Sequence, residues 1–394
     1  MSAMPVLFLI VFIDLLGFGV VIPLLPFYGL RFGASAAEVT WMMACYSLAQ
    51  FFCSPLLGRL SDRVGRRPVL LLSLCASIAS YLWLGFADAL WMLFAARLLA
   101  GAGAGNIAAA QAYISDVTTS ETRAKGMGMI GAAFGLGFTF GPALGGLLAG
   151  SNASAAALAR PAFLAAGLSA LAFVVALARL KESLPESART AARRPSRWQV
   201  ARDVATRPVL RRLILLLFIT ITAFAAMETT FALWANRALA WGPRAVGFNF
   251  LYVGLVLVAV QGGLIGRLSR RFGEARLVLA GAVLIALGLL GLPFALAVWR
   301  VLVVDTCLAL GMGLLNPSLT SLISLEAGSG ERGGILGVSQ SASSLSRILG
   351  PAIAGPLFQG FGRDAPYYAG AAVMVLVLAL ASRVPRVRRE RIPS

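Results

Sequence analysis

The 394-residue sequence contains no histidine, only four cysteines and only 16 acidic residues. Histidine is the side chain whose charge ordinarily changes near neutral pH, so any proton transfer must use carboxylates. The cysteines lie in apolar segments without the spacing of a metal site, and we expect inert thiols and no bound metal. No Walker phosphate-binding loop occurs, and the glycine-rich stretch 101–106 lies inside an apolar segment. The sequence therefore predicts no cofactor, no ATP hydrolysis and no enzymatic activity.

Charged residues are scarce as well. They make up 13% of the chain, whereas hydrophobic residues make up 59% and the mean hydropathy is +0.84. This is more apolar side chain than one globular core can bury. A helix needs about 20 apolar residues to cross a bilayer. Such runs lie near residues 5–29, 38–58, 69–87, 89–114, 126–149, 158–179, 209–235, 246–266, 277–298, 299–325, 333–358 and 367–384. The sequence therefore predicts an all-α polytopic membrane protein with twelve transmembrane helices in the lipid bilayer.

The net charge of +18 predicts the orientation of these helices. The arginines are dispersed at helix ends without interleaved aromatic residues, which fits the positive-inside rule and not nucleic-acid binding. They concentrate in alternate loops. Those loops carry Arg59, Arg63, Arg66, Arg67, Arg123, Lys125, Arg267, Arg270, Arg271 and Arg276. Both chain termini fall on the same side as these loops, so we expect both termini to be cytoplasmic.

An internal repeat divides the chain into two halves. When the sequence is shifted by 208 residues, "GRLSDRVG" at 58–65 lies over "GRLSRRFG" at 266–273. The polar segment 181–208 falls between the two copies. The predicted domains are a six-helix bundle at 1–180, a basic cytoplasmic linker at 181–208, a second six-helix bundle at 209–384 and a basic tail at 385–394. Repeats of this kind are typical of secondary transporters.

Several motifs carry a family resemblance over nearly the whole chain. The stretch "GRLSDRVGRR" (58–67) resembles the signature loop of the major facilitator superfamily, and "RLLAGAGAG" (97–105) and "GLGFTFGPALGG" (135–146) resemble motifs of its drug:proton antiporters. "DLLGFGVVIPLLP" (14–26) and "METTFALW" (227–234) resemble the tetracycline-pump-like branch. The resemblance implies two pseudo-symmetric bundles with alternating access, exporting a small lipophilic drug or metabolite in exchange for protons. It also implies a monomer in the inner (cytoplasmic) membrane.

Two alternatives remain open: proton-coupled uptake or facilitated diffusion of a small nutrient such as a sugar, and a membrane receptor that transports nothing. The sequence also departs from the tetracycline pumps in the third apolar segment, 69–87, where Ser80 stands in place of an acid. It therefore leaves open whether tetracycline is a substrate.

The stretch 58–67 also has a physical interpretation. Asp62 lies at the end of the second helix, and an anion beside the N-terminus of another helix, here the one beginning near Gly333, is stabilised by about 0.3–2 kcal/mol. The resemblance adds that Arg66 bridges Asp62 to Asp116. The predicted gating latch consists of Gly58, Asp62, Arg63, Gly65, Arg66, Asp116 and Arg123. The alternative is that these arginines only set the topology.

Ionisable residues inside the membrane are costly and mark pathways or proton sites. A rise of about 1.5 Å per residue places Asp14 and Arg97 at the same depth, so we expect them to meet. Either Asp14 is a proton carrier or the two residues form a permanent ion pair. The predicted proton-coupling residues are Asp14, Arg97, Glu228, Asp305 and Arg347. The last three lie at similar depth and predict one cluster, in which Glu228 could instead bind a cationic substrate.

The apolar segment 126–149 and the substrate cavity complete the predicted sites. Glycines spaced for close helix packing, together with a proline, predict a packing and hinge segment. Its residues are Gly137, Gly141, Pro142, Gly145 and Gly146. The substrate cavity is predicted from polar and aromatic residues on the helices, which are also common in ordinary helix packing. They are Phe18, Asn106, Gln111, Phe224, Met227, Phe231, Trp234, Asn316 and Gln340.

Overall fold

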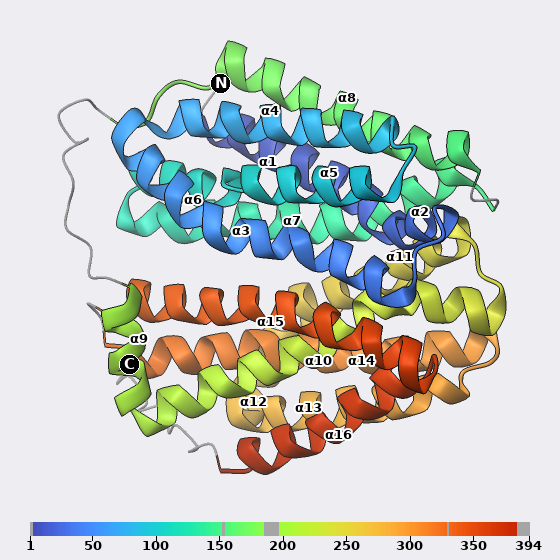
Figure 1. Cartoon of the computed structure of the whole chain (residues 1–394). Helices are drawn as coiled ribbons and strands as arrows, with labels where there is room; N and C mark the ends of the chain where they lie inside the picture. The colour runs from blue at the N-terminus through green and yellow to red at the C-terminus, as the bar shows by residue number, and fades with distance from the viewer. Residues whose placement is uncertain (1–2, 152–153, 185–196, 329–330, 384–394) are drawn as a thin grey trace. The chain divides into compact units, whose positions relative to one another are not determined.

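The computed structural model of the chain describes residues 3–151, 154–184, 197–328 and 331–383 (Figure 1). Every regular element in these ranges is a helix, which confirms the all-α prediction. In the first half they are α1 (Ala3–Val21), η1 (Ile22–Leu24), α2 (Leu25–Arg31), α3 (Ala36–Val64), α4 (Arg66–Gly85), α5 (Leu90–Gly103), α6 (Asn106–Val117), α7 (Ser120–Ala149) and α8 (Ala155–Arg179). In the second half they are α9 (Arg197–Thr206), α10 (Pro208–Leu239), α11 (Pro243–Ala259), η3 (Val260–Leu264), α12 (Ile265–Phe272), α13 (Glu274–Gly291), η4 (Leu292–Phe294), α14 (Val298–Glu326), α15 (Arg332–Phe361) and α16 (Ala365–Ala381).

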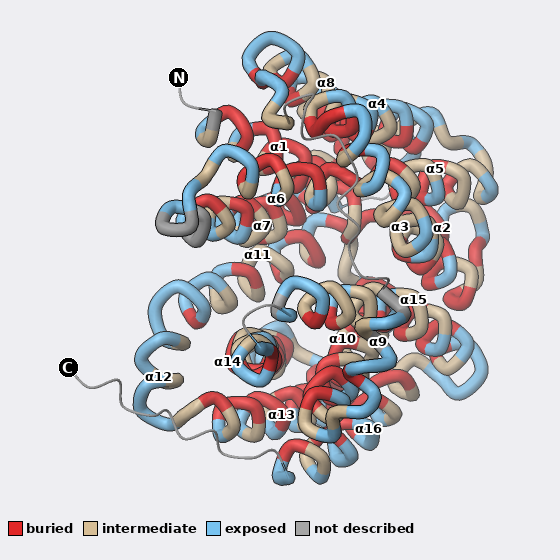
Figure 2. Tube along the Cα trace, turned by 90° about the vertical axis from the view of Figure 1, so that its left-hand side faces the viewer, coloured by how far each residue is buried: buried red, intermediate tan, exposed pale blue. Residues whose placement is uncertain are grey.

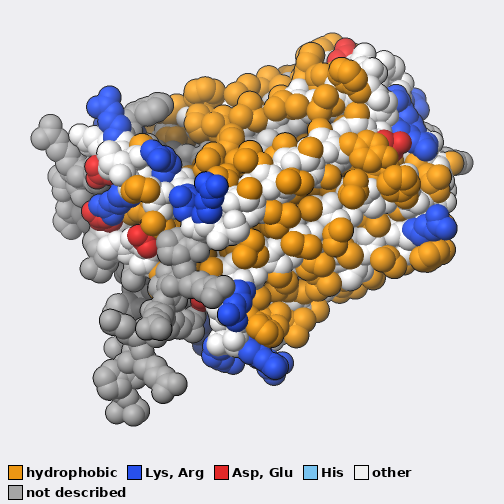
Figure 3. All heavy atoms as spheres, turned by 90° about the horizontal axis from the view of Figure 1, so that it is seen from below, with side chains coloured by type: hydrophobic (Ala, Val, Ile, Leu, Met, Phe, Trp, Pro, Cys, Tyr) orange, Lys and Arg blue, Asp and Glu red, His pale blue; other side chains and the backbone are white. Residues whose placement is uncertain are grey.

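One helix, or a run of helices that follow one another along the chain with at most a short break, occupies each of the twelve predicted segments. Nine stretches of the described chain are long and apolar enough to cross a membrane. Large apolar side chains remain exposed outside the core, including Phe361 at 82%, Trp299 at 64% and Phe52 at 63%. Hydrophobic side chains cover much of the face shown in Figure 3, and Lys and Arg gather at its two ends. Such a surface fits a lipid environment.

Three local features differ from the prediction. The motif 58–64 forms the last two turns of α3 and is not a loop, because the helix continues until Gly65. The fourth predicted segment is broken at Ala104 and Gly105, between α5 and α6. The predicted linker contains the short helix α9, and its residues 185–196 lie outside the described ranges. The tail 385–394 also lies outside them.

The chain divides into two compact units. The first comprises Met1–Arg193, Thr229–Gly254 and Pro351–Arg363, and the second comprises Arg194–Glu228, Leu255–Gly350 and Asp364–Ser394. The core of the first unit is built from aliphatic residues of α1, α4, α6, α7 and α8. A smaller cluster of Val260, Leu277 and Leu314 lies in the second unit, where α12 has no buried residue (Figure 2). The domain bounds expected from the repeat remain a prediction.

Glycines allow α1 and α7 to pack backbone against backbone in the first unit, where the two helices run side by side (Figure 1). A methyl group placed on Gly19 would lie 2.6 Å from the Gly137 carbonyl oxygen, and one placed on Gly141 would lie 2.7 Å from the Gly19 carbonyl carbon. Gly145 closes the same contact at Val20, and Gly146 approaches the backbone of α11. Glycine is required because any larger side chain would separate the helices. The packing role predicted for these α7 glycines fits these contacts, whereas the hinge role remains a prediction.

The repeat has a backbone counterpart. Gly65 ends α3 with φ +110° and Gly273 ends α12 with φ +81°, and the next helix starts at the following residue in both places. Positive φ is readily adopted only by glycine. The two copies of the motif therefore form the same sharp elbow between consecutive helices.

Candidate functional site

Asp14 lies on α1 inside the first unit and is 6% exposed. Asn106, the first residue of α6, donates a hydrogen bond from its amide nitrogen to Oδ2 of Asp14. The other carboxylate oxygen, Oδ1, is buried and has no hydrogen-bond partner among the described groups. A buried oxygen without a partner is costly as an anion. Oδ1 is therefore the atom at which a proton would bind.

Arg97 was expected to meet Asp14, either as a partner of a proton carrier or in a permanent ion pair, and the structure shows no ion pair between these two described residues. Its guanidinium carbon lies 4.5 Å from the centroid of the Tyr46 ring and 5.7 Å from that of Phe18. Arg97 is 5% exposed, and its Nε has no hydrogen-bond partner among the described groups. The two aromatic faces stabilise the cation by about 2 kcal/mol when it is desolvated. Helical rise predicts depth but not the direction of a side chain around its helix, so the two groups share a level without touching.

Three further residues of this site were missed by the sequence analysis. Tyr46 covers the Arg97 guanidinium, Ser77 of α4 lies close to the Asp14 carboxylate, and Tyr81 of α4 is near both charges. Tyr81 is 5% exposed. The signal available in the sequence was a hydroxyl-bearing side chain within an apolar helix. That signal is weak, because such hydroxyls commonly bond to their own helix backbone.

The second part of the site is a charge network at the elbow between α3 and α4. Arg66 donates from Nη1 to Asp62 Oδ1 at 2.5 Å and to Ser61 Oγ at 3.3 Å, and from Nε to Asp116 Oδ2 at 3.0 Å. The Arg66 side chain is 6% exposed, the Asp116 side chain 21% and the Asp62 side chain 41%. The predicted bridge from Asp62 through Arg66 to Asp116 is thus present, linking α3, α4 and α6.

Glu182, which follows α8, is a member of this network that the sequence analysis missed. Its Oε1 accepts hydrogen bonds from the backbone N–H groups of Arg66 (2.8 Å), Ser183 (3.0 Å) and Leu184 (3.0 Å), and its Oε2 accepts one from Arg67 (3.1 Å). A carboxylate at a helix N-terminus satisfies N–H groups that lack a partner within the helix. Burial alone would raise the pKa of Glu182, but the four backbone donors together lower it below its ordinary value of 4.5.

Glu182→Gln should lower the melting temperature at pH 7 by roughly 2 °C, since a charge-assisted cap contributes about 1–2 kcal/mol. The glutamine amide carries no charge. Its NH2 group would also face the Arg67 backbone N–H, so that two donors would meet where the carboxylate oxygen now accepts. Because the folded pKa is lowered, the contribution is complete above pH 4.5 and is lost as the pH falls through the folded value. Melting curves of purified protein between pH 3.5 and 7 test this. The variant should lose less stability than the wild type below pH 4.5. If the melting temperatures of the two proteins fall in parallel as the pH is lowered, Glu182 is not the group responsible. Asp88→Asn, at an exposed acid of the first unit, is the control.

The remaining latch residues are placed less completely. Gly65 forms the elbow and Arg63 is exposed, as befits the last turn of α3. Gly58 has open space around its Cα, and the side chain of Arg123 lies outside the described residues. A contact of Asp62 with the helix that begins near Gly333 would join the two units, and it remains a prediction.

In the second unit, Glu228 of α10 and Arg347 of α15 are close enough for the arginine charge to act on the carboxylate. The two helices pack there because Gly350 approaches the backbone of Thr222 and Ser346 Oγ donates to the Phe218 carbonyl at 2.8 Å. Asp305 is 3% exposed on α14. The pairing of Glu228 with Arg347 supports part of the predicted cluster, and membership of Asp305 remains a prediction.

The predicted cavity residues separate into two groups. Phe18 and Asn106 belong to the site around Asp14 and Arg97. Met227, Phe231 and Trp234 are buried, and the Phe231 ring lies 6.2 Å from Trp234 in an aromatic cluster. Phe224 and Asn316 are half-buried, whereas Gln111 and Gln340 are exposed. Their contribution to a substrate cavity remains a prediction.

Comparison with known proteins gives consistent relatives. Residues 7–351 and 239–394 match the model of the Major Facilitator Superfamily. The class B tetracycline resistance protein of Escherichia coli is 31% identical over 89% of this chain and 87% of its own length. Multidrug resistance protein 2 of Bacillus subtilis is 29% identical over 94% of this chain and 92% of its own length. The crystal structure of the human organic anion transporter MFSD10 (TETRAN) is 25% identical with a TM-score of 0.71, covering 96% of this chain and 98% of that one.

Proposed function

The chain belongs to the major facilitator superfamily, a family of multi-pass membrane transporters, and from this premise we propose that it exports a small lipophilic drug or metabolite in exchange for protons. Its curated relatives are named for tetracycline and multidrug resistance. This supports export rather than nutrient uptake, and a transporter rather than an enzyme. We further propose an inner-membrane location, cytoplasmic termini and a monomeric state, with the arginine-rich loops as the reason for the orientation.

The observation that carries the proton coupling is the half-satisfied carboxylate of Asp14. One oxygen accepts a hydrogen bond from Asn106, and the other is buried without a partner in the part of the chain that the structure describes. A proton on Oδ1 makes the group neutral, and release of that proton leaves an anion beside Asn106, Ser77 and Tyr81. Arg97 lies in the same unit, stacked on the Tyr46 ring, and its Nε has no hydrogen-bond partner among the described residues. A change in the distance between Arg97 and Asp14 would therefore alter how strongly the proton is held.

Proton coupling in the second unit has a separate candidate. Glu228 is an acid of that unit that lies close enough to a basic residue, Arg347, for the two charges to interact. We propose that this pair either carries a second proton or binds the polar end of a substrate. The two roles differ in whether Glu228→Gln changes proton release or only substrate affinity.

Everted membrane vesicles with an imposed pH gradient, acid inside, provide the test. A substrate of an exporter should release the gradient within seconds of its addition, because each molecule pumped into the vesicle brings protons out. Vesicles lacking the protein are the control. If candidate lipophilic drugs leave the gradient intact while a nutrient collapses it in right-side-out vesicles, the protein is an uptake system and the export proposal is wrong.

A further inference from the structure

Arg97 places a buried positive charge inside the first unit. The residue lies on α5, is 5% exposed, and its Nε has no hydrogen-bond partner among the described groups. No carboxylate of the described residues forms an ion pair with this guanidinium. The aromatic faces of Phe18 and Tyr46 offset only part of the hydration that a cation loses when it is buried. The guanidinium therefore retains the capacity to bind an anion.

The rings around this charge form an aromatic surface to which three helices contribute. The ring centroid of Phe18 on α1 lies 5.0 Å from that of Tyr46 on α3 and 5.6 Å from that of Phe138 on α7. The Phe138 ring is in turn stacked with Phe134 at 6.0 Å. All four residues are half-buried, whereas the cation beside them is buried. A ligand that reaches these rings therefore meets an apolar aromatic surface with a positive charge next to it.

The other groups near the guanidinium carry no negative charge when Asp14 holds its proton. The titratable side chains close enough to act on the charge of Arg97 are two phenols and a thiol, Tyr46, Tyr81 and Cys45. Phenols and thiols are ordinarily neutral at pH 7. Protonation of Asp14 thus leaves the positive charge of Arg97 uncompensated among the groups around it.

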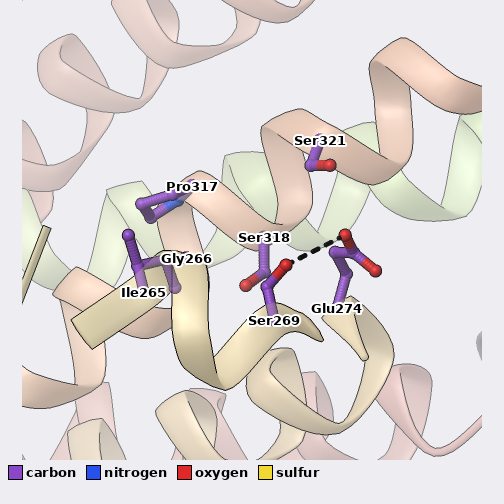
Figure 4. Close-up of a pocket in the computed structure, with 7 residues that line it drawn as sticks. All are labelled: Ile265, Gly266, Ser269, Glu274, Pro317, Ser318 and Ser321. Carbon is purple, nitrogen blue, oxygen red and sulfur yellow. Dashed lines mark hydrogen bonds between the residues drawn. The ribbon is translucent and has the colours of Figure 1, made fainter. Parts of the chain in front are cut away.

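A cavity in the second unit offers the opposite chemistry. Its volume is about 110 Å³, it lies between α12, the start of α13 and α14, and Glu274 there accepts a hydrogen bond from Ser269 Oγ at 3.3 Å (Figure 4). The residues that line it include an acid but neither a basic nor an aromatic residue: Ile265, Gly266, Ser269, Glu274, Pro317, Ser318 and Ser321. An aromatic anion is therefore expected to bind beside Arg97 and not in this cavity.

We propose that the protein takes aromatic anions as substrates, with Arg97 binding the negative group and the rings of Phe18 and Phe138 contacting the aromatic body. The proposal rests on the export function proposed above and names its substrate class. A guanidinium binds a carboxylate through two parallel N–H donors, and aromatic side chains stack on a planar apolar ring. Both kinds of contact are available at one place in the first unit, since Phe18 touches the guanidinium on one side and Phe138 on the other.

Ligand binding to the purified full-length protein tests this substrate class without transport. The probes share a naphthalene ring and differ in charge: 2-naphthoate, the neutral 2-naphthamide and the cationic 2-naphthylmethylammonium. At constant ionic strength, 2-naphthoate should raise the melting temperature in a saturable way and more than the other two, because only the anion pairs with Arg97. Acetate supplies the charge without the ring. The proposal is overturned if 2-naphthoate gives no saturable rise, if either other naphthalene probe matches it, or if acetate alone gives the full rise.

Two variants and a control assign the binding to this site. Arg97→Met removes the charge but keeps an unbranched side chain, and it should weaken 2-naphthoate binding by about 10- to 100-fold, as expected for hydrogen bonds to a charged group. Its smaller response to the amide should not change. Phe138→Ala should weaken the binding of both probes. Arg160→Met, which removes an exposed cation of the same unit, should bind 2-naphthoate as the wild type does. Wild-type affinity for 2-naphthoate in a folded Arg97→Met would exclude Arg97 as the anion site.

The probe comparison on the wild-type protein decides the charge preference even if Arg97→Met fails to fold. This test and the export test also fail separately. A protein that releases the pH gradient only for neutral or cationic drugs is an exporter whose substrates are not anions, and it contradicts the substrate class alone. Binding of 2-naphthoate without release of a gradient by any substrate would support the anion site and contradict export.

Discussion

Replacing Asp14 by asparagine is expected to reduce proton-driven transport to the level of vesicles that lack the protein. Asparagine has the shape of the carboxylate and can still bond to Asn106, but it cannot take up and release a proton. The carboxylate is 6% exposed, so no bulk-water group can substitute for it at that point. The measurement is substrate accumulation in everted vesicles energised by a pH gradient, with the amount of inserted protein determined in parallel.

A gradient-free assay separates a coupling role from a structural one. Substrate counterflow, in which labelled and unlabelled substrate exchange without net proton movement, should persist in Asp14→Asn because the helices still pack. Asp88→Asn neutralises an exposed acid of the same unit and should transport at the wild-type rate. Accumulation by Asp14→Asn at the wild-type level would exclude Asp14 as the carrier.

Arg66→Ala is expected to have the largest effect on stability, and to abolish transport with it. The substitution removes three hydrogen bonds at once and leaves Asp62 and Asp116 facing each other without a cation. Removing the central partner of a buried network costs about 3–5 kcal/mol, and the partial exposure of Asp62 reduces this to about 2–4 kcal/mol. The melting temperature of purified protein and the transport rate in proteoliposomes should both fall.

The conservative variant and a neighbouring arginine complete this test. Arg66→Lys should recover only part of the stability, because a single ammonium group cannot reproduce the fork of the guanidinium toward two acids. Arg59, at an exposed position near the end of the preceding helix α3, should tolerate alanine with little change. An unchanged melting temperature and transport rate in Arg66→Ala would mean that the network contributes neither to stability nor to transport, and that these arginines only set the orientation of the helices in the membrane.

The positions of the helices could be predicted from the sequence because the bilayer demands long apolar runs. The first run, expected at 5–29, is observed as Ala3–Arg31 in three successive helices, and the run expected at 158–179 is observed as α8. The end of α3 was misjudged by six residues, since charged residues at 59–64 indicated a loop although they are compatible with two more helical turns. The glycine that ends this helix, Gly65, was visible in the motif.

The partners within the site could be predicted only where they are close in sequence or fixed by a motif. Arg66 and Asp62 are four residues apart on neighbouring turns, and their contact is the ordinary spacing for an ion pair. The partners of Asp14 and Arg97 depend on how each helix is rotated, and on the break at Ala104 and Gly105 that brings Asn106 to Asp14. The spacing of residues in the sequence gives the depth of a side chain along its helix, but it does not show how that helix is rotated relative to its neighbours.

The glycine contact between α1 and α7 also limits which parts of the first unit can move. At Gly19, Gly137 and Gly141 no side chain stands between the two backbones, so the pair has no rotamers with which to absorb a displacement, and sliding would bring main-chain atoms into collision. The two helices therefore behave as one rigid body, and Asp14, next to Leu15 in this contact, is carried with it. A change in the surroundings of Asp14 therefore has to come from the helices on the other side of the carboxylate. There the break between α5 and α6 separates Arg97 from Asn106, and it allows the backbone movement that the contact between α1 and α7 prevents.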